Sequence, residues 1–335
     1  MIDKSMREKL LRIVQKLPLV SGYFSGIATI FMLHRVEKLN PLGIIHNENM
    51  KVSPEFLEKF IQSLAKKHYK FISLDQLSEL LESGSAVASD KYALFTLDDG
   101  YADNFLNALP IFERLNVPFT VYLTSSFCDR EAILWWYILE DLLIQNDSIN
   151  LWGCEDYPCK SIIEKNDLFL KIRNIILALD QNNLENSLKS LFKSYSIDWY
   201  KKCDELALNW GQAKEISQSN MGTIGGHTKL HKSLRGLSRD QMQREVISGN
   251  MRVQERIGVY PRHFSYPFGG PSEAGIREFS FIKSIEEIKT ATTTRRGNIY
   301  LDHKNYLNCL PRIMLTEDIE VSDISLPRRR RLAVR

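Results

Sequence analysis

The sequence predicts an α/β fold, namely a distorted (β/α) barrel of seven or eight parallel strands with a helical insertion. Short apolar runs rich in β-branched and aromatic residues recur along the chain, as expected of parallel strands buried on both faces. Stretches with helical spacing lie between many of them, and seven or eight such units close into a barrel. An open doubly wound sheet is the alternative, and it is weakened because no glycine-rich phosphate loop follows the first run.

Eight segments carry the strand signal. Each is a short run dominated by residues such as Ile, Val, Phe, Tyr and Thr, which favour extended backbone. In chain order the predicted strands are residues 27–33, 70–73, 92–97, 118–124, 221–225, 263–267, 289–293 and 309–315.

Helices are predicted where apolar residues repeat every three or four positions. Residues 54–66 place apolar side chains on one helical face. Ser53 precedes Pro54 there, which is a good N-cap followed by proline at the first helical position. The pattern returns at residues 74–83 and at 239–257, where Ser238 is the expected cap.

Residues 130–205 break this rhythm. The stretch is helix-like and aromatic, with Trp135, Trp136 and Trp152, and it shows no strong strand signal. We interpret it as a helical insertion on the barrel. Its aromatic side chains could stack on sugar rings, but a tryptophan-rich helical hairpin more often forms core, and we favour core.

Composition indicates an ordinary soluble globular protein. The chain has 335 residues, 44% hydrophobic and 25% charged, with a net charge of +3. Nucleic-acid binding is not expected, because the body of the chain has no basic stripe. Five cysteines at irregular spacing argue against a disulfide framework. Cys154 and Cys159 lack a second ligand pair at the spacing of a structural zinc site.

The chain divides into an N-terminal amphipathic helix and linker (1–26), the barrel with its insertion (27–322) and a basic tail (323–335). Residues 17–33 are too interrupted to span a membrane and lack a signal-peptide cleavage site, so we expect a cytoplasmic location. The basic helix at 4–17 and the tail could touch an anionic membrane surface. Such contact would suit a lipid-linked sugar substrate.

The strongest chemical signal is a pair of adjacent carboxylates at a strand end. Asp98 and Asp99 directly follow the strand 92–97, and Gly100 lets the chain turn sharply. Catalytic groups gather at the C-terminal ends of the strands of a parallel barrel. Neighbouring side chains diverge there, so one carboxylate could hold a metal while the other faces the substrate. The competing interpretation is a polar turn, since Asp-Asp-Gly also favours turns.

A second signal is the histidine pair His227 and His231. They follow an apolar strand and two glycines, and their i, i+4 spacing would place both imidazoles on one side of a helical turn. With one carboxylate they make a three-ligand metal set with open positions. A bound metal would polarise a carbonyl and lower the pKa of water, with the second carboxylate as general base.

These motifs resemble those of the polysaccharide deacetylases, the NodB-homology domain of carbohydrate esterase family 4. The family's T-F-D-D-G motif appears as residues 96–100, which implies Asp98 as catalytic base and Asp99 as a metal ligand. The H-[ST]-x-x-H motif matches residues 227–231 and implies His227 and His231 as the other ligands. The resemblance implies a bound divalent metal. Zn²⁺ is the expected ion, with Co²⁺ or Ni²⁺ as alternatives.

The remaining family motifs fit less well. The R-x-P-[YF] motif appears as residues 265–268, with Ser265 where the family has an arginine that steadies the catalytic base. By resemblance, the residues that would line the substrate site are Tyr266, Pro267 and Phe268.

The family's late catalytic histidine is also missing. The corresponding region, residues 310–313, resembles that of the family branch that acts on exopolysaccharide or cell-surface glycans. Arg312 in this region could take over the role of the arginine that is missing at position 265. His34 and His303 are the candidates for protonating the leaving amine, with a structural strand-end histidine as the competing interpretation.

The sequence therefore predicts a metal-dependent hydrolase that removes an acetyl group from an N-acetylated sugar of a polysaccharide or glycan precursor. A deformylase or O-deacetylase on the same scaffold stays open, as does a catalytically silent carbohydrate-binding relative. A glycosidase would need two carboxylates about 5 to 9 Å apart, which adjacent aspartates do not obviously provide.

Overall fold

Parallel strands closed into a barrel form the centre of the structure, a computed structural model that describes residues 26–87, 91–180 and 183–324. Across these residues seven strands pair in the order β1 (Ala28–Leu33), β12 (Leu310–Met314), β11 (Thr290–Arg296), β10 (His263–Ser265), β9 (Gly222–Gly226), β6 (Phe119–Leu123) and β5 (Tyr92–Leu97). Strand β5 pairs back with β1 and closes the ring. Short strand β4 pairs with the beginning of β5, while β6 pairs with its end. The predicted barrel is confirmed.

All eight segments predicted as strands are strands. Two short segments, β2 (Arg35–Val36) and β3 (Lys51–Val52), form a separate parallel pair beside the barrel. The predicted strands are β1 (Ala28–Leu33), β4 (Lys70–Phe71), β5 (Tyr92–Leu97), β6 (Phe119–Leu123), β9 (Gly222–Gly226), β10 (His263–Ser265), β11 (Thr290–Arg296) and β12 (Leu310–Met314).

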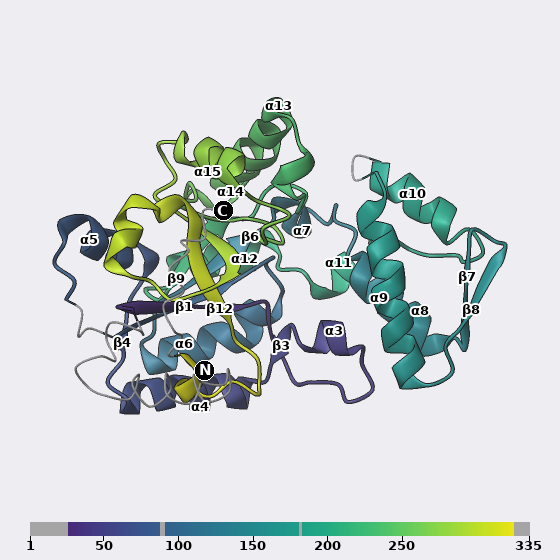
Figure 1. The fold of residues 1–335 in the computed structure, drawn as a ribbon, viewed down its shortest axis with the longest axis horizontal. Coiled ribbons are helices and arrows are strands. Elements are labelled where there is room, and N and C mark those ends of the chain that lie inside the picture. The colour runs from purple at the N-terminus through teal and green to yellow at the C-terminus, as the bar shows by residue number, and fades with distance from the viewer. Residues whose placement is uncertain (1–25, 88–90, 181–182, 325–335) are drawn as a thin grey trace, which may run out of the picture.

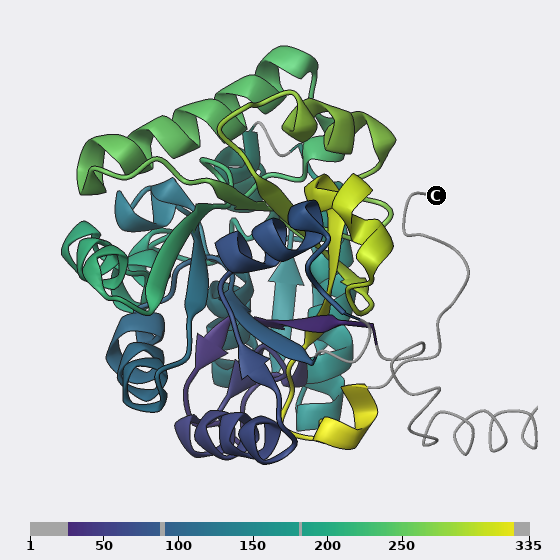
Figure 2. The same ribbon diagram turned by 90° about the vertical axis from the view of Figure 1, so that its left-hand side faces the viewer.

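Helices surround the strands on the outside (Figure 2). The predicted helices and caps are present: the Ser53 side chain accepts from the Phe56 amide at the start of α4 (Pro54–Lys66), and Ser238 caps α13. The segment 239–257 is continuous but contains a π-helical turn. The helices around the barrel, besides α4, are α5 (Leu74–Ser83), α6 (Leu109–Leu115), α7 (Ser125–Cys128), α12 (Trp210–Gln218), α13 (Arg239–Gln243), α14 (Gly249–Ile257) and α15 (Ile276–Lys283), and a short helix, α3 (Ile45–Glu48), lies beside it.

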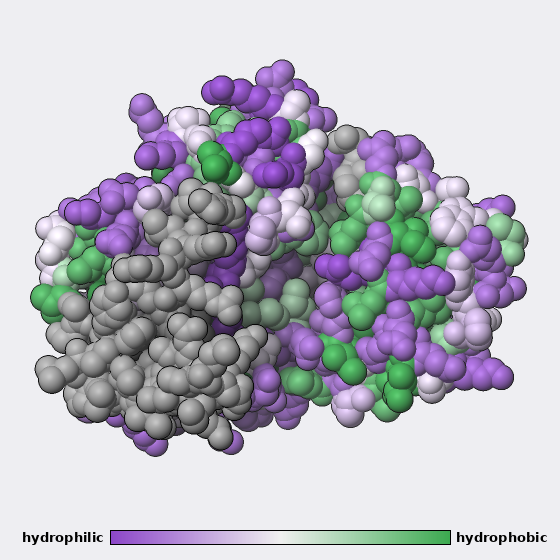
Figure 3. All heavy atoms as spheres, in the orientation of Figure 1, coloured by the Kyte–Doolittle hydropathy of each residue, from purple (hydrophilic) through white to green (hydrophobic). Residues whose placement is uncertain are grey.

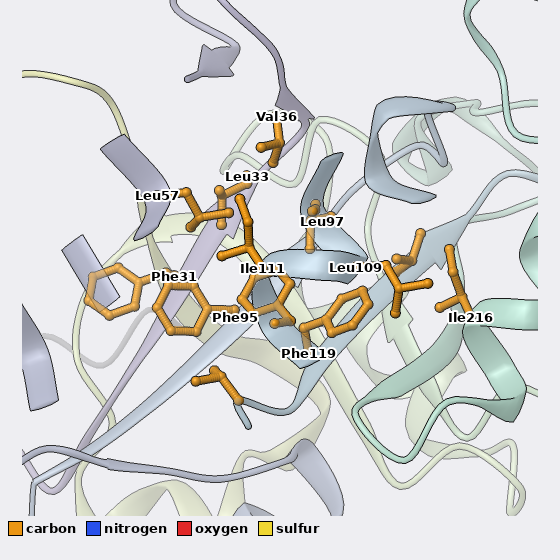
Figure 4. Packing of buried hydrophobic residues seen from close by; sticks show 14 of the residues in the cluster. Phe31, Leu33, Val36, Leu57, Phe95, Leu97, Leu109, Ile111, Phe119 and Ile216 are labelled. Atoms are coloured by element: carbon orange, nitrogen blue, oxygen red, sulfur yellow. The ribbon is translucent and has the colours of Figure 1, made fainter. Parts of the chain in front are cut away.

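Aliphatic and aromatic side chains fill the core between the strands and these helices (Figure 4). The Phe31 and Phe95 rings on neighbouring strands stack with centroids 5.2 Å apart, and Phe112 stacks on Phe119 at 4.5 Å. All four are at most 2% exposed. Burial of such a side chain contributes roughly 1.5–3 kcal/mol, which fixes strand register firmly enough to position residues at the strand ends.

The insertion forms a separate lobe beside the barrel (Figure 1). It has its own hydrophobic core, which includes Phe169 and Ile172. Contrary to expectation, it contains an antiparallel hairpin. The second hairpin strand is polar and mostly exposed, so it lacks the apolar run that marks a buried strand. The elements are α8 (Trp135–Gln145), β7 (Ser148–Leu151), β8 (Glu155–Pro158), α9 (Ile162–Ala178), α10 (Leu184–Leu191) and α11 (Lys201–Leu206).

The segment between β2 and β3 joins the barrel to the insertion, and α3 lies between the two lobes (Figure 1). The buried carboxylate of Glu140 on α8 accepts from the Ile44 amide at 2.9 Å and from Asn47 Nδ2 at 2.7 Å. On α9, Asn166 Oδ1 accepts from the Ile45 amide at 2.7 Å. Ile44 itself is buried in the core of the insertion. These contacts hold the insertion beside the barrel.

The basic helix expected at 4–17 and the basic residues at 327–331 lie outside the described residues. Among the helices of the described chain, none combines the length and the apolar character needed to cross a bilayer.

Candidate active site

A cavity of about 590 Å³ opens where the barrel meets the insertion, and Figure 3 shows a hollow between the two lobes. On the barrel side its lining comes from the C-terminal ends of parallel strands. His34 follows β1, Asp98 and Asp99 follow β5, and His227 follows β9. This is the end of a parallel barrel where catalytic groups are found, and its size is that of a ligand site.

Asp99 and the two motif histidines converge on one point of this cavity. Asp99 Oδ1 lies 3.3 Å from His227 Nε2 and 3.2 Å from His231 Nε2. One ligand atom from each residue lies within 4.8 Å of the others. His227 Nδ1 is 2.8 Å from the Ser265 carbonyl oxygen. When the ring is neutral, a proton on Nδ1 bonds that carbonyl and leaves the Nε2 lone pair available to a metal.

The expectation that these histidines share a helical turn is wrong. Residues 227–233 form an irregular loop. The imidazoles converge because Thr228 and His231 adopt left-handed backbone, with φ of 66° and 55°. Asp99 (φ 73°) and Phe268 (φ 60°) at the same cavity do so too. Non-glycine residues rarely adopt this conformation, and such strain concentrates at functional sites.

The chemistry of this donor set fits a divalent metal. One carboxylate and two imidazoles are the ligands of many zinc sites that keep open positions. Asp99 Oδ1 is buried and has no hydrogen-bond partner in the described structure, which is unusual for a buried carboxylate unless a cation occupies the space beside it. Burial opposes ionisation, but His231 and His227 hold the pKa of Asp99 well below its usual range. The triad therefore presents an ionised oxygen and imidazole nitrogens to one point.

Asp98 is held by Arg312, which reaches into the barrel from β12. Arg312 Nη1 donates to Asp98 Oδ1 and Nη2 to Oδ2, both at 2.7 Å. The guanidinium also donates to the Thr96 and Ser265 hydroxyls and, through Nε, to the Thr293 carbonyl. All five of its N–H groups thus have acceptors, as a fully buried arginine requires.

This ion pair controls the charge on Asp98. Burial alone would raise the pKa of Asp98, but the charge and hydrogen bonds of Arg312 outweigh it, so the pKa lies below its ordinary value. Ser265 leaves room for the incoming guanidinium and bonds it directly at 2.9 Å. The sequence-based assignment of Arg312 to the place of the missing arginine is therefore compatible with the contacts.

The two candidate histidines lie at different ends of the barrel. His34 lines the cavity, and its Nδ1 has no hydrogen-bond partner among the described residues. Burial lowers the pKa of His34 below its ordinary value. His303 belongs to a short helix, Leu301–Asn305, that begins two residues after Ile299. Ile299 pairs with Ala28 at the start of β1, the end of the barrel opposite to the cavity. Of the two, only His34 lines the cavity that contains Asp98.

Of the three expected substrate contacts, the structure brings one to the cavity. The Phe268 ring lines it and packs against His231 with centroids 4.8 Å apart. Tyr266 is 1% exposed, and its hydroxyl donates to the Asn308 carbonyl. Pro267 is also buried, and neither it nor Tyr266 is part of the cavity lining.

The far wall of the cavity was not predicted. It comes from the insertion and from the segment that Glu140 fixes to it. Trp135, expected to be core, packs in the core of the insertion and also borders the cavity. No motif marks these positions, because the insertion reaches the barrel only through tertiary contacts. The lining residues of this wall are His46, Asn47, Met50, Trp135, Trp136, Tyr137, Arg173 and Leu177.

Known structures with the same fold are deacetylases of low sequence identity. The Streptococcus pyogenes deacetylase PplD in complex with acetate superposes with a TM-score of 0.59 and 16% identity, over 90% of this chain and 98% of that one. IcaB from Ammonifex degensii gives 0.55 and 14%, over 88% and 93%. A de-N-acetylase from Aggregatibacter actinomycetemcomitans gives 0.53 and 15%, over 89% and 98%. No curated protein matches the sequence.

The family model for polysaccharide deacetylase matches residues 85–279, more than half of the chain. The match contains both aspartates and both histidines of the cavity, and it ends before Arg312. The chain therefore belongs to the polysaccharide deacetylase family and is a hydrolase of carbon–nitrogen bonds in carbohydrates.

Proposed function

We propose that the protein is a metal-dependent hydrolase that removes the acetyl group from an N-acetylated sugar of a polysaccharide or glycan precursor. The observation that carries this proposal is the position of two differently held carboxylates in one cavity. Asp98 is paired with Arg312, and Asp99 faces His227 and His231. Because the two adjacent carboxylates have different partners, Asp98 is suited to act as a general base and Asp99 to bind a metal beside it.

Asp99, His227 and His231 would hold the metal. When bound, a divalent metal supplies Lewis-acid polarisation of the amide carbonyl and lowers the pKa of water. We assign Asp98 as the base that takes a proton from the attacking water. Arg312 keeps it ionised and fixes both of its oxygens, so the carboxylate needs little reorganisation before it accepts the proton.

Breaking the C–N bond requires a proton on the leaving amine. We assign this transfer to His34, because it lines the cavity and its Nδ1 has no bond to the described protein. The proton that Asp98 takes from the attacking water balances the one that the amine receives. Phe268 and Trp136 border the same space and would keep bulk water from the acetyl group. One water is consumed, and the products are a free amino sugar and acetate.

The test is release of acetate from N-acetylglucosamine oligomers by metal-free protein, by protein with added zinc or cobalt, and by Asp98→Asn. We expect metal-dependent release that Asp98→Asn reduces by roughly 10²–10⁴-fold, the usual contribution of a general base. Asp302→Asn, an exposed aspartate at the other end of the barrel, is the matched control. Release of formate from N-formyl sugars without release of acetate would replace the proposal with a deformylase.

A further inference from the structure

Helix α9 of the insertion has apolar residues on two sides. One side, with Phe169 and Ile172, is buried in the core of the insertion. On the other side, Ile163, Leu170 and Leu177 are 72%, 47% and 36% exposed. Helices of globular proteins normally bury their one apolar face and expose a polar one. The exposed side of α9 is therefore suited to contact an apolar molecule.

These apolar residues form a track along one side of the helix, interrupted by Asn166 and Arg173, that leads into the active-site cavity. Ile163, Leu170, Arg173 and Leu177 follow the three- and four-residue spacing of one helix face. The track is about 21 Å long at 1.5 Å per residue. Leu177 and Arg173 at its inner end line the cavity. In Figure 3 hydrophobic residues cover much of the insertion over α9.

Leu42 and Ile45, which are 73% and 59% exposed, add to the apolar surface. Ile45 lies beside the track because its amide donates to Asn166 on the same helix. The apolar surface therefore includes the segment between β2 and β3 that closes the cavity.

Arg173 is the one lysine or arginine among the residues that line the cavity. No carboxylate lies within ion-pair distance of its guanidinium in the described part of the chain. Its charge reaches His46 on the same wall, whose pKa is lowered by burial and by Arg173. The carboxylates of the lining, Asp98, Asp99 and Glu273, belong to the barrel side. An anionic group of a ligand is therefore attracted to the insertion side of the cavity, where Arg173 supplies the positive charge.

We propose that the substrate is an N-acetylated sugar carried on a lipid phosphate. The sugar enters the catalytic cavity past Leu177, the phosphate binds Arg173, and the hydrocarbon chain lies outward along Leu170 and Ile163. The order of these groups matches the order of such a molecule, sugar then phosphate then lipid. A guanidinium suits a phosphate because it can donate two parallel hydrogen bonds. This inference rests on the proposed deacetylation for its sugar end only.

The first test measures binding without catalysis. Full-length protein is titrated with farnesyl phosphate, farnesol and inorganic phosphate, each below its aggregation concentration. We expect farnesyl phosphate to bind at least about tenfold more tightly than either fragment, because it uses both the charge and the apolar track. Arg173→Gln should weaken farnesyl phosphate by about tenfold and farnesol little. Leu170→Ser should weaken both.

Lys171→Gln is the matched control, because Lys171 lies on the same helix with its ammonium over the Tyr157 ring and outside the cavity lining. It should bind like the wild type. The proposal is overturned if Arg173→Gln binds farnesyl phosphate normally, if Lys171→Gln loses as much affinity, or if inorganic phosphate binds as tightly as farnesyl phosphate. It is also overturned if the protein is a dimer that Leu170→Ser dissociates, because the track would then be covered by a second copy.

The second test compares deacetylation of prenyl-phosphate-linked N-acetylglucosamine with that of neutral N-acetylglucosamine oligomers. Arg173→Gln should raise KM for the first substrate by about tenfold more than for the second, with kcat for the first retained. Hydrolysis of neutral oligomers without farnesyl phosphate binding would reject this inference alone. Binding of farnesyl phosphate without any acetate release would reject the proposed deacetylation and leave the lipid-phosphate site standing.

Discussion

Arg312 and Asp98 are joined by two parallel hydrogen bonds of 2.7 Å, with the arginine 0% and the aspartate 2% exposed. The two residues lie 214 positions apart in the sequence. They meet because β12 and β5 both pair with β1, so their side chains share the barrel interior. A buried ion pair of this kind is stable only while both partners are present.

We expect Arg312→Met to destabilise the protein by about 3–5 kcal/mol, because Asp98 would remain buried without its counter-charge. The double variant Asp98→Leu/Arg312→Met should recover part of this loss. Chemical denaturation of the two single variants and the double variant gives the coupling energy. Additive losses would show that the pair is not coupled. Arg312→Lys should fold but lose activity, since an ammonium cannot hold both carboxylate oxygens.

The free energy of unfolding should depend on pH in a way that reveals the ion pair of Asp98. Its folded pKa lies below the ordinary value, so its pairing stabilises the protein above the unfolded pKa of about 3.9 and is lost as the pH falls through the folded pKa. The stability gap between the wild type and Asp98→Asn should be constant above about pH 5 and narrow below about pH 4. Denaturation curves from pH 7 to pH 3 measure it. A gap that stays constant throughout would contradict the assignment.

Removal of one ligand of the Asp99, His227 and His231 triad should cost metal affinity. Loss of a supporting contact to a metal ligand typically costs about 10–100-fold, and we expect His231→Ala to cost more. His46→Ala removes a histidine that lines the same cavity outside the triad, and it should bind zinc like the wild type. Calorimetric titration with zinc compares the three proteins. Equal affinities for His231→Ala and the wild type would place the metal elsewhere.

The insertion should loosen when Glu140 is changed. Glu140→Ala leaves the Ile44 amide without its acceptor, and it removes one of the two acceptors of Asn47 Nδ2, the other being the Trp136 carbonyl. A buried unsatisfied group costs about 1–3 kcal/mol. Hydrogen exchange at residues 44–48 should accelerate, and KM should rise because this segment lines the cavity. Glu131→Ala, an exposed glutamate just before α8, serves as control. Unchanged exchange at 44–48 would show that the segment is held by packing alone.

The sequence alone determined the barrel and the chemistry of its strand ends. Eight apolar runs became eight strands, because parallel strands buried on both faces need continuous apolar residues. Asp98, Asp99, His227 and His231 were visible because each follows such a run. These signals are local, so composition and spacing report them directly.

Only the tertiary structure decided the conformation of the histidine loop, the ion pair of Asp98 and the cavity wall opposite the barrel. The i, i+4 spacing of the histidines suggested a helix, but left-handed backbone at Thr228 and His231 brings them to Asp99. The contact of Arg312 with Asp98 depends on the closure of the barrel. The cavity wall opposite the barrel includes two segments, about a hundred residues apart in the sequence, that Glu140 joins. Long-range pairing of this kind leaves no periodic trace in a single sequence, since each partner satisfies its own local pattern and the contact is fixed by packing.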